Sequence, residues 1–127
     1  MSWQDSDVRA EHANDLREWA GGNLAMMAAT ELLIRGFDGS FINPGYPWME
    51  VRDDGGAWIN FEAIPEHIGA KSGGEQRFLT IAASIGDSAV DVNLYMALSL
   101  DQKHMDLVVC AVAHAGGFGE KYPWPSK

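Results

Sequence analysis

The feature that most constrains the fold is an apolar stretch near the start of the chain, Leu24-Ala-Met-Met-Ala-Ala-Thr-Glu-Leu-Leu-Ile34. On a helix, its apolar residues fall on nearly every side rather than along one stripe. Such a helix must be covered from several directions, so we expect it to lie at the centre of the molecule. Asn23 is the expected N-cap, Arg35 the last helical residue, and Gly36 the C′ residue that follows it.

Four further helices are expected around this segment, from helical spacing and from capping patterns. They cover residues 2–19 with Ser2 and Asp5 as a capping pair, 72–86, 92–98 after Asp91, and 99–115 after Ser99. Residues 1–117 are expected to form a single globular domain, and residues 118–127 an extended C-terminal tail. At this length a domain buries roughly two-thirds of the surface that its unfolded chain exposes, so one core is feasible.

A capping box explains one motif that also resembles an enzyme signature. Ser72-Gly-Gly-Glu-Gln resembles the signature motif of ABC-type ATPases, which helps to close a nucleotide sandwich in that family. The Gly-rich phosphate loop that holds the nucleotide, ending in Gly-Lys-Ser/Thr, occurs nowhere in the chain. We therefore interpret Ser72 and Glu75 as a helix cap and not as part of an ATPase.

A β-hairpin is predicted in the middle of the chain. Asp53-Asp-Gly-Gly56 separates two segments of alternating apolar residues, Trp48–Arg52 and Ala57–Phe61. Phe41-Ile42 is a candidate third short strand. The expected fold class is therefore α+β and predominantly helical, with about five helices and one small hairpin.

The register of this hairpin follows if Asp54-Gly55 is the central turn pair. Val51 then lies opposite Trp58, and Trp48 lies opposite Phe61. Cross-strand pairs of this kind contribute roughly 0.2–1 kcal/mol each. Both faces of the hairpin would carry large apolar groups, so it must pack on helices, on a third strand or on a partner.

Charge and composition exclude several classes of partner. The chain has 18 acidic and 9 basic residues and a formal net charge of -9 at pH 7. Nucleic-acid backbones and anionic membranes attract cationic surfaces, so we expect no direct binding to either. The polar N-terminus does not fit a secretory signal, and no apolar run approaches the ~20 residues that span a bilayer. With Cys110 as its single cysteine, the chain has no intrachain disulfide, and we expect a cytoplasmic protein.

Two groups of residues are weak candidates for catalysis. Cys110 and His114 lie four residues apart, so on a helix they share a face and could form a thiolate–imidazole pair. Cys110 falls in the middle of an apolar helix, which favours a core thiol, and His114 suits a helix C-terminus. The other group is a histidine–carboxylate site assembled from Glu62, Glu66 and His67. Neither has a recognisable nucleophile, base and oxyanion arrangement.

The histidines do not indicate a metal site. His12, His67 and His104 lack the spacing of known zinc motifs. Asp101 and His104 could each offer one ligand, but an aspartate at a helix start is already explained by the helix dipole. We therefore expect no metal and no cofactor.

The aromatic residues are the preferred candidates for partner binding. The tripeptide Tyr-Pro-Trp occurs twice, as Tyr46 to Trp48 before the hairpin and as Tyr122 to Trp124 in the tail. Trp and Tyr are frequent interface anchors, and Pro restricts the backbone and so reduces the entropy lost on docking. Together with Trp58, these residues could bind a partner protein or a second copy. Alternatively, the tail folds back over its own core and covers the hairpin.

Three function classes follow. The preferred one is a non-enzymatic interaction or regulatory protein that self-associates through the aromatic hairpin and tail. The second is an acidic mimic of nucleic acid that inhibits a DNA-binding or defence protein, although the acidic residues are scattered rather than grouped. The third is a small enzyme that uses the Cys/His or His/carboxylate residues named above.

Overall fold

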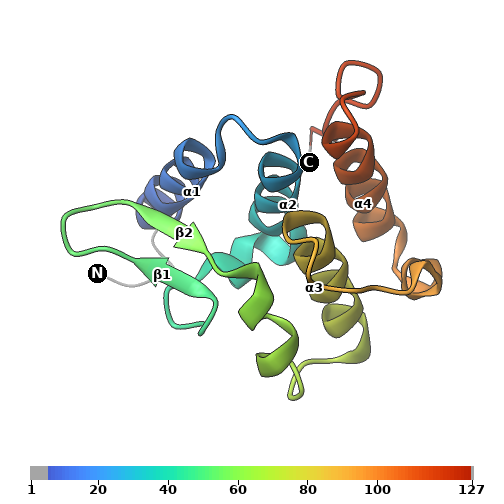
Figure 1. Cartoon of the computed structure of the whole chain (residues 1–127), viewed down its shortest axis with the longest axis horizontal. Helices are drawn as coiled ribbons and strands as arrows, with labels where there is room; N and C mark the ends of the chain where they lie inside the picture. Colours follow the sequence, from blue (N-terminus) through green and yellow to red (C-terminus); the bar gives the residue numbers. More distant parts are fainter. Residues whose placement is uncertain (1–5, 127) are drawn as a thin grey trace.

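A computed structural model describes residues 6–126, which form a predominantly helical α+β fold with one antiparallel hairpin (Figure 1). The fold class predicted from the sequence is confirmed. The elements are α1 (Ser6–Ala20), α2 (Leu24–Arg35), η1 (Gly36–Ile42), β1 (Met49–Val51), β2 (Ala57–Ile59), η2 (Phe61–Ala63), η3 (Pro65–His67), α3 (Gly73–Gly86), η4 (Leu94–Ser99) and α4 (Gln102–Ala115), where η denotes a 3-10 helix.

Helix α2 lies at the centre, as its all-round apolar sequence predicts. It packs against α1, α3, α4 and the turn η1 (Figure 1). Ala29, Leu32 and Leu33 on this helix are completely buried. The side chain of Asn23 accepts a hydrogen bond from the Met26 N–H at 3.0 Å, which confirms the predicted N-cap.

The residue after α2 is a glycine for a different reason from the one expected. Gly36 does not adopt left-handed angles, since its φ is -76° and its ψ is 145°. A Cβ atom at Gly36 would lie 2.2 Å from Cζ of Phe78, so only a residue without a side chain fits here. The left-handed residues follow it, with φ of 51° at Phe37, 56° at Asp38 and 74° at Gly39.

Three helix starts differ from the expected caps or lie outside the described residues. Asn93 rather than Asp91 caps η4, and its side chain accepts a hydrogen bond from the Tyr95 N–H at 3.0 Å. Asp101 rather than Ser99 caps α4, because the chain is still in η4 at Ser99. The expected pair Ser2 and Asp5 lies outside the described residues.

The hairpin register is shifted by one residue from the predicted one. Val51 pairs with Ala57, and Trp58 pairs with Glu50 rather than with Val51. A shift of one residue changes every cross-strand pair, so Trp58 lies opposite a carboxylate side chain instead of an apolar one.

The hairpin turn explains the shift. The Gly55 N–H donates to the Arg52 carbonyl at 3.2 Å, and the Arg52 N–H donates to the Gly56 carbonyl at 3.1 Å. The loop therefore contains three residues, Asp53 to Gly55, and not the two assumed for the prediction. Gly55 and Gly56 have φ of 95° and 94°, which a three-residue loop with a left-handed glycine accommodates.

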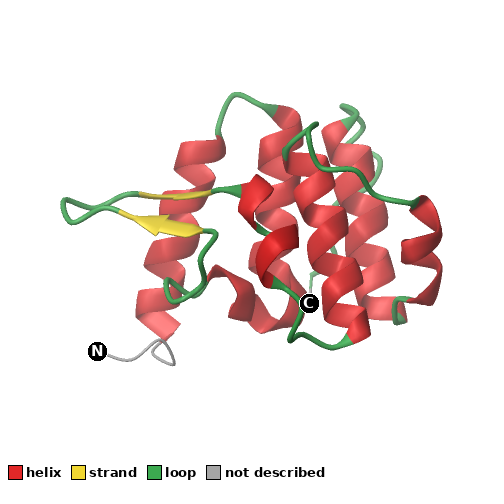
Figure 2. Ribbon diagram, turned by 60° about the horizontal axis from the view of Figure 1, so that its bottom comes forward, coloured by secondary structure: helices red, strands yellow, loops and turns green. Residues whose placement is uncertain are grey.

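The hairpin packs beside α1, and both views place it at one end of the molecule (Figures 1 and 2). The candidate third strand is wrong. Phe41 and Ile42 are buried, but they lie in η1, and the sheet of the described chain has two strands. Within residues 6–126, no helix combines the length and the apolar character needed to cross a bilayer.

A partly buried carboxylate, that of Glu31, joins α1 to α2. Oε1 of Glu31 accepts a hydrogen bond from Nε of Arg17 at 2.8 Å, and its Oε2 accepts one from Nε of Arg35 at 2.7 Å. Burial raises the pKa of Glu31, but the hydrogen bonds from both arginines outweigh it, so the pKa is lowered overall. The hydrogen bond to Glu31 in turn raises the pKa of Arg17.

Glu31→Gln is expected to reduce the free energy of unfolding by about 1–3 kcal/mol at neutral pH, because it removes charge-assisted hydrogen bonds. Since the folded pKa of Glu31 lies below the unfolded one, this stabilisation is complete above about pH 4.5 and is lost as the pH falls through the folded value. Urea unfolding of both proteins at pH 7 and near pH 3 measures the difference. The exposed Glu66, changed to Gln, is the control. A Glu31→Gln penalty that stays constant with pH would contradict this assignment.

Candidate functional site

Trp48 is part of the core and not of the surface. Its side chain is completely buried, its Nε1 donates to the Phe41 carbonyl at 2.9 Å, and its ring stacks on Tyr46 at 4.4 Å. The Asn60 N–H donates to the Trp48 carbonyl at 2.8 Å, so the expected pairing of Trp48 with Phe61 is wrong. In this fold Trp48 cannot anchor a partner.

The other hairpin aromatics are only partly accessible. Tyr46 and Trp58 are both half-buried. The Tyr46 hydroxyl accepts a hydrogen bond from the Lys71 ammonium, which also lies over the Tyr46 ring at 4.4 Å. Tyr46 is therefore already occupied by contacts within the chain.

Residues 118–126 fold back onto the molecule, over α2 and α4 rather than over the hairpin (Figure 1). The Trp124 ring lies 4.8 Å from the His114 ring, with the Arg35 guanidinium 5.2 Å from the Trp124 centroid. Arg35 Nη1 also donates to the Pro125 carbonyl at 3.0 Å. The expectation that a folded-back tail covers the hairpin is wrong, because its partners are side chains of the two helices.

Cys110 and His114 both face this tail and do not form a pair with each other. The Cys110 thiol lies 3.5 Å from the Pro123 carbonyl, whereas His114 Nε2 donates to the Tyr122 carbonyl at 2.8 Å. Burial and the neighbouring Asp106 raise the pKa of Cys110, which keeps the thiol protonated at neutral pH. The arrangement is that of a core thiol and a tail-binding histidine.

The second catalytic candidate is also separated. Glu62, Glu66 and His67 lie on or beside the short helices η2 and η3, and all three are exposed. His67 Nδ1 donates to the Ala63 carbonyl at 2.8 Å. Within the described chain, neither glutamate makes a hydrogen bond with His67, so these residues form no acid–base pair.

Asp101 and His104 form a structural pair in which His104 is buried and Asp101 is exposed. His104 Nδ1 lies 2.7 Å from Asp101 Oδ1, and its Nε2 accepts the Phe37 N–H at 3.0 Å. The backbone and side-chain hydrogen bonds from His104 lower the pKa of Asp101. An aspartate that orients a histidine is typical of catalytic sites, but here a backbone N–H occupies the second nitrogen. The pair holds the left-handed turn at Phe37.

A histidine elsewhere is similarly accounted for, since half-buried His12 has its Nδ1 3.0 Å from the Val8 carbonyl. No cluster of three or more histidine, cysteine or acidic side chains suited to a metal ion occurs in residues 6–126.

The most exposed apolar side chains lie on η4, which no sequence argument had selected. The relative exposures are 77% for Leu94, 75% for Tyr95 and 69% for Leu98. We call these three residues the η4 surface. The short helix stands at the edge of the molecule, packed against α3 and α4, and buries only Ala97 (Figure 2). The sequence feature that could have indicated this surface is a short run of apolar residues, Leu94 to Leu98, of which only the small Ala97 is buried.

Comparison of the chain with protein-family models, with curated proteins and with solved structures finds no significant match.

Proposed function

We propose that this chain is a non-enzymatic protein-interaction module that binds its partner through the η4 surface. The observation that supports the proposal is the exposure of Leu94, Tyr95 and Leu98, at 77%, 75% and 69%. Single exposed apolar residues are common on soluble proteins, but three within five residues of one short helix form a patch. Tyr95 and Leu98 are three residues apart on a 3-10 helix, so they point to the same side.

Burying these three side chains against a partner would contribute substantially to the free energy of binding. Fully burying a side chain such as leucine is worth about 1.5–3 kcal/mol, and tyrosine is among the residues most enriched at interface centres. Because η4 sits at the edge of the molecule, a partner with an apolar recess would surround its exposed side chains (Figure 2).

The charge around η4 indicates the chemistry of the partner's rim. The exposed residues Asp91 and Asp101 flank η4 in the sequence, and the chain carries a net charge of -9. A two-fold contact between two copies would bring these acidic flanks together, which opposes association. A partner with basic residues around its recess fits this surface better, and self-association is the alternative that the experiment distinguishes.

The test places a photo-crosslinking amino acid at Tyr95 in the native cell and identifies the adduct by mass spectrometry. We expect one dominant adduct with a different protein, and none when the same group replaces Arg52 in the exposed hairpin turn. An adduct between two copies would make the partner a second molecule of this chain and overturn the proposed basic-rimmed partner. The absence of any specific adduct would overturn the interaction function.

The double change Tyr95→Ser and Leu98→Ser is expected to abolish capture of that partner without unfolding the chain. Both side chains are exposed, so the free energy of unfolding should change by less than about 0.5 kcal/mol. Val51→Ser is the matched control, since Val51 is an exposed apolar residue on the hairpin, and it should leave capture unchanged. Equal losses of capture with both variants would argue against a specific η4 surface.

A further inference from the structure

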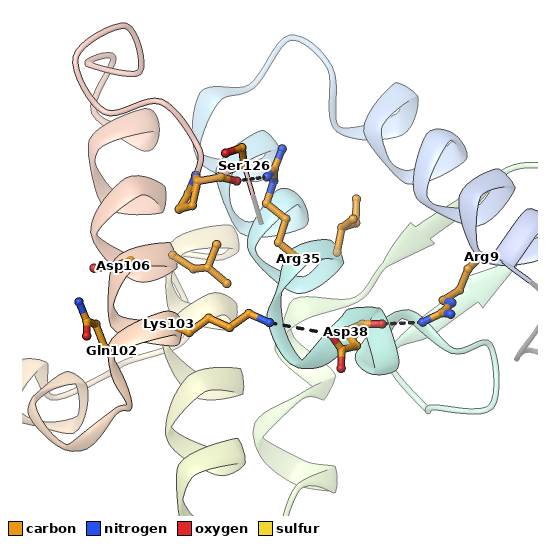
Figure 3. A pocket seen from close by; sticks show the side chains of 10 residues that line it. Arg9, Arg35, Asp38, Gln102, Lys103, Asp106 and Ser126 are labelled. Atoms are coloured by element: carbon orange, nitrogen blue, oxygen red, sulfur yellow. Dashed lines mark hydrogen bonds and ion pairs between the residues drawn. The ribbon is translucent and has the colours of Figure 1, made fainter.

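A pocket of about 1200 Å³ opens between α1, α2 and α4 (Figure 3). Arg9 reaches it from α1, Arg35 from α2 and Lys103 from α4. Asp38, in the left-handed turn after α2, lies between Arg9 and Lys103. Three segments distant in sequence thus direct cationic side chains toward one concave region.

The charges in this pocket differ from those of the chain as a whole. Three of the 9 basic residues line it, together with two acidic residues, Asp38 and Asp106. Glu31, which pairs with Arg35 at 2.7 Å, offsets the charge of Arg35, so the pocket is close to neutral in a chain of net charge -9. Arg9 and Lys103 would attract an anion locally.

Two of the cations keep donors available. Nη1 of Arg9 donates to the Asp38 backbone carbonyl at 2.7 Å, which positions the guanidinium. Nζ of Lys103 lies 3.8 Å from Oδ1 of Asp38, longer than a hydrogen bond. Within residues 6–126, the remaining nitrogens of Arg9 and the ammonium of Lys103 have no hydrogen-bond acceptor. These groups can donate to a ligand without breaking an existing hydrogen bond.

Arg35 lines the opposite side of the pocket from Arg9 and Lys103 and does not change position freely. Its Nε donates to Glu31 at 2.7 Å and its Nη1 donates to the Pro125 carbonyl at 3.0 Å, so the guanidinium is held in place. Ile34, Leu107 and Pro125 contribute apolar lining beside it. A ligand that fits both parts carries an anionic group and an apolar body.

We propose that this pocket binds a small organic anion. Its carboxylate or phosphate group lies between Lys103 and Arg9, and its apolar body lies against Ile34 and Leu107. Asp38 occupies the same region with a carboxylate that is 91% exposed, and it competes with the ligand for Lys103. Removing the Asp38 charge should therefore strengthen binding.

The experiment titrates the full chain by calorimetry with three probes of similar shape: phenyl phosphate, benzoate and benzyl alcohol. At least one of the two anions is expected to bind with a Kd of about 1 mM or lower, and benzyl alcohol is expected not to bind. Inorganic phosphate should bind more weakly than phenyl phosphate if phenyl phosphate is the bound probe. Absence of binding by both anions at about 10 mM, or equal binding of benzyl alcohol, would overturn the proposal.

Three variants locate the binding. Lys103→Gln, at an exposed position in the first turn of α4, should weaken binding about tenfold, the effect of one charge-assisted hydrogen bond. Asp38→Asn should strengthen it severalfold, and asparagine tolerates the left-handed φ of 56°. Arg52→Gln removes a cation in the hairpin turn, paired with Asp54 at 3.1 Å, and should have no effect.

The pattern across the variants decides the outcome. Equal weakening by Lys103→Gln and Arg52→Gln would indicate a general effect of net charge and would overturn the pocket as the site. Weaker binding by Asp38→Asn would overturn the competition by Asp38. Far-ultraviolet circular dichroism and thermal unfolding of each variant establish that the fold is retained. The proposal does not depend on the interaction through η4, so either can fail alone.

Discussion

Replacing Gly36 by alanine is expected to lower the free energy of unfolding by about 3 kcal/mol, the upper part of the range for an overpacked core. The added Cβ would lie 2.2 Å from Cζ and 2.6 Å from Cε2 of Phe78. Phe78 cannot easily move away, because it is completely buried and its ring contacts Phe37 at 5.2 Å and His104 at 5.2 Å. Urea or thermal unfolding of the purified chain measures the loss.

The matched control is the same substitution at Gly74, where an added Cβ meets no heavy atom within 4 Å. Alanine there should stabilise α3 by about 0.5–1 kcal/mol, so the two alanine variants should shift stability in opposite directions. Adding Phe78→Leu to Gly36→Ala should recover part of the loss, because a smaller side chain relieves the clash. If Gly36→Ala is as stable as the parent chain, the close packing of α2 on α3 described above is wrong.

Trp48→Ala is expected to cost about 3–5 kcal/mol, because it removes a large side chain that is completely buried. It also leaves the Phe41 carbonyl without the Nε1 donor that it accepts from at 2.9 Å. Trp58→Ala, on the paired strand, should cost clearly less, because Trp58 is half-buried. Chemical unfolding of the two variants, followed by circular dichroism, gives the comparison.

The contrast between these two tryptophans also tests their placement. A larger loss from Trp58→Ala than from Trp48→Ala would contradict the assignment of Trp48 to the core. Trp48→Phe keeps an aromatic ring in the core but removes the donor to Phe41 and part of the ring volume, at an expected cost of about 1–3 kcal/mol, less than that of Trp48→Ala.

The features that sequence predicted well are those decided by local chemistry. The central position of α2 follows from its all-round apolar sequence, and the Asn23 cap follows from one side chain reaching one backbone N–H. The capping box of Ser72 and Glu75 is present with both hydrogen bonds, at 3.3 and 3.0 Å. Each involves residues within a few positions of each other.

The features that sequence missed depend on residues far apart in the chain. Gly36 is required by Phe78 on another helix, and the left-handed Phe37 is held by His104. No pattern in the neighbouring sequence predicts either contact. The prediction of the hairpin register was wrong because two adjacent glycines, Gly55 and Gly56, permit either a two-residue or a three-residue loop.

In the candidate site, too, the features that depend on residues far apart in the chain were not predicted from the sequence. Trp and Tyr are frequent interface anchors and were therefore the preferred candidates. Composition does not show which of them is buried in the core, and Trp48 is completely buried. The η4 surface became visible only once the structure placed Leu94, Tyr95 and Leu98 outside the core. The pocket between α1, α2 and α4 is a meeting of three elements that no spacing within one segment predicts.

The central place of α2 has a consequence for how the chain is made. The cover that α4 gives to this helix is complete only at Ala115, about 80 residues after α2 ends at Arg35. At a synthesis rate of about 5–20 residues per second, the nascent chain carries an apolar helix without that cover for roughly 4–16 s. During this interval the growing chain presents a substrate to chaperones, and slowed translation between residues 36 and 115 prolongs it.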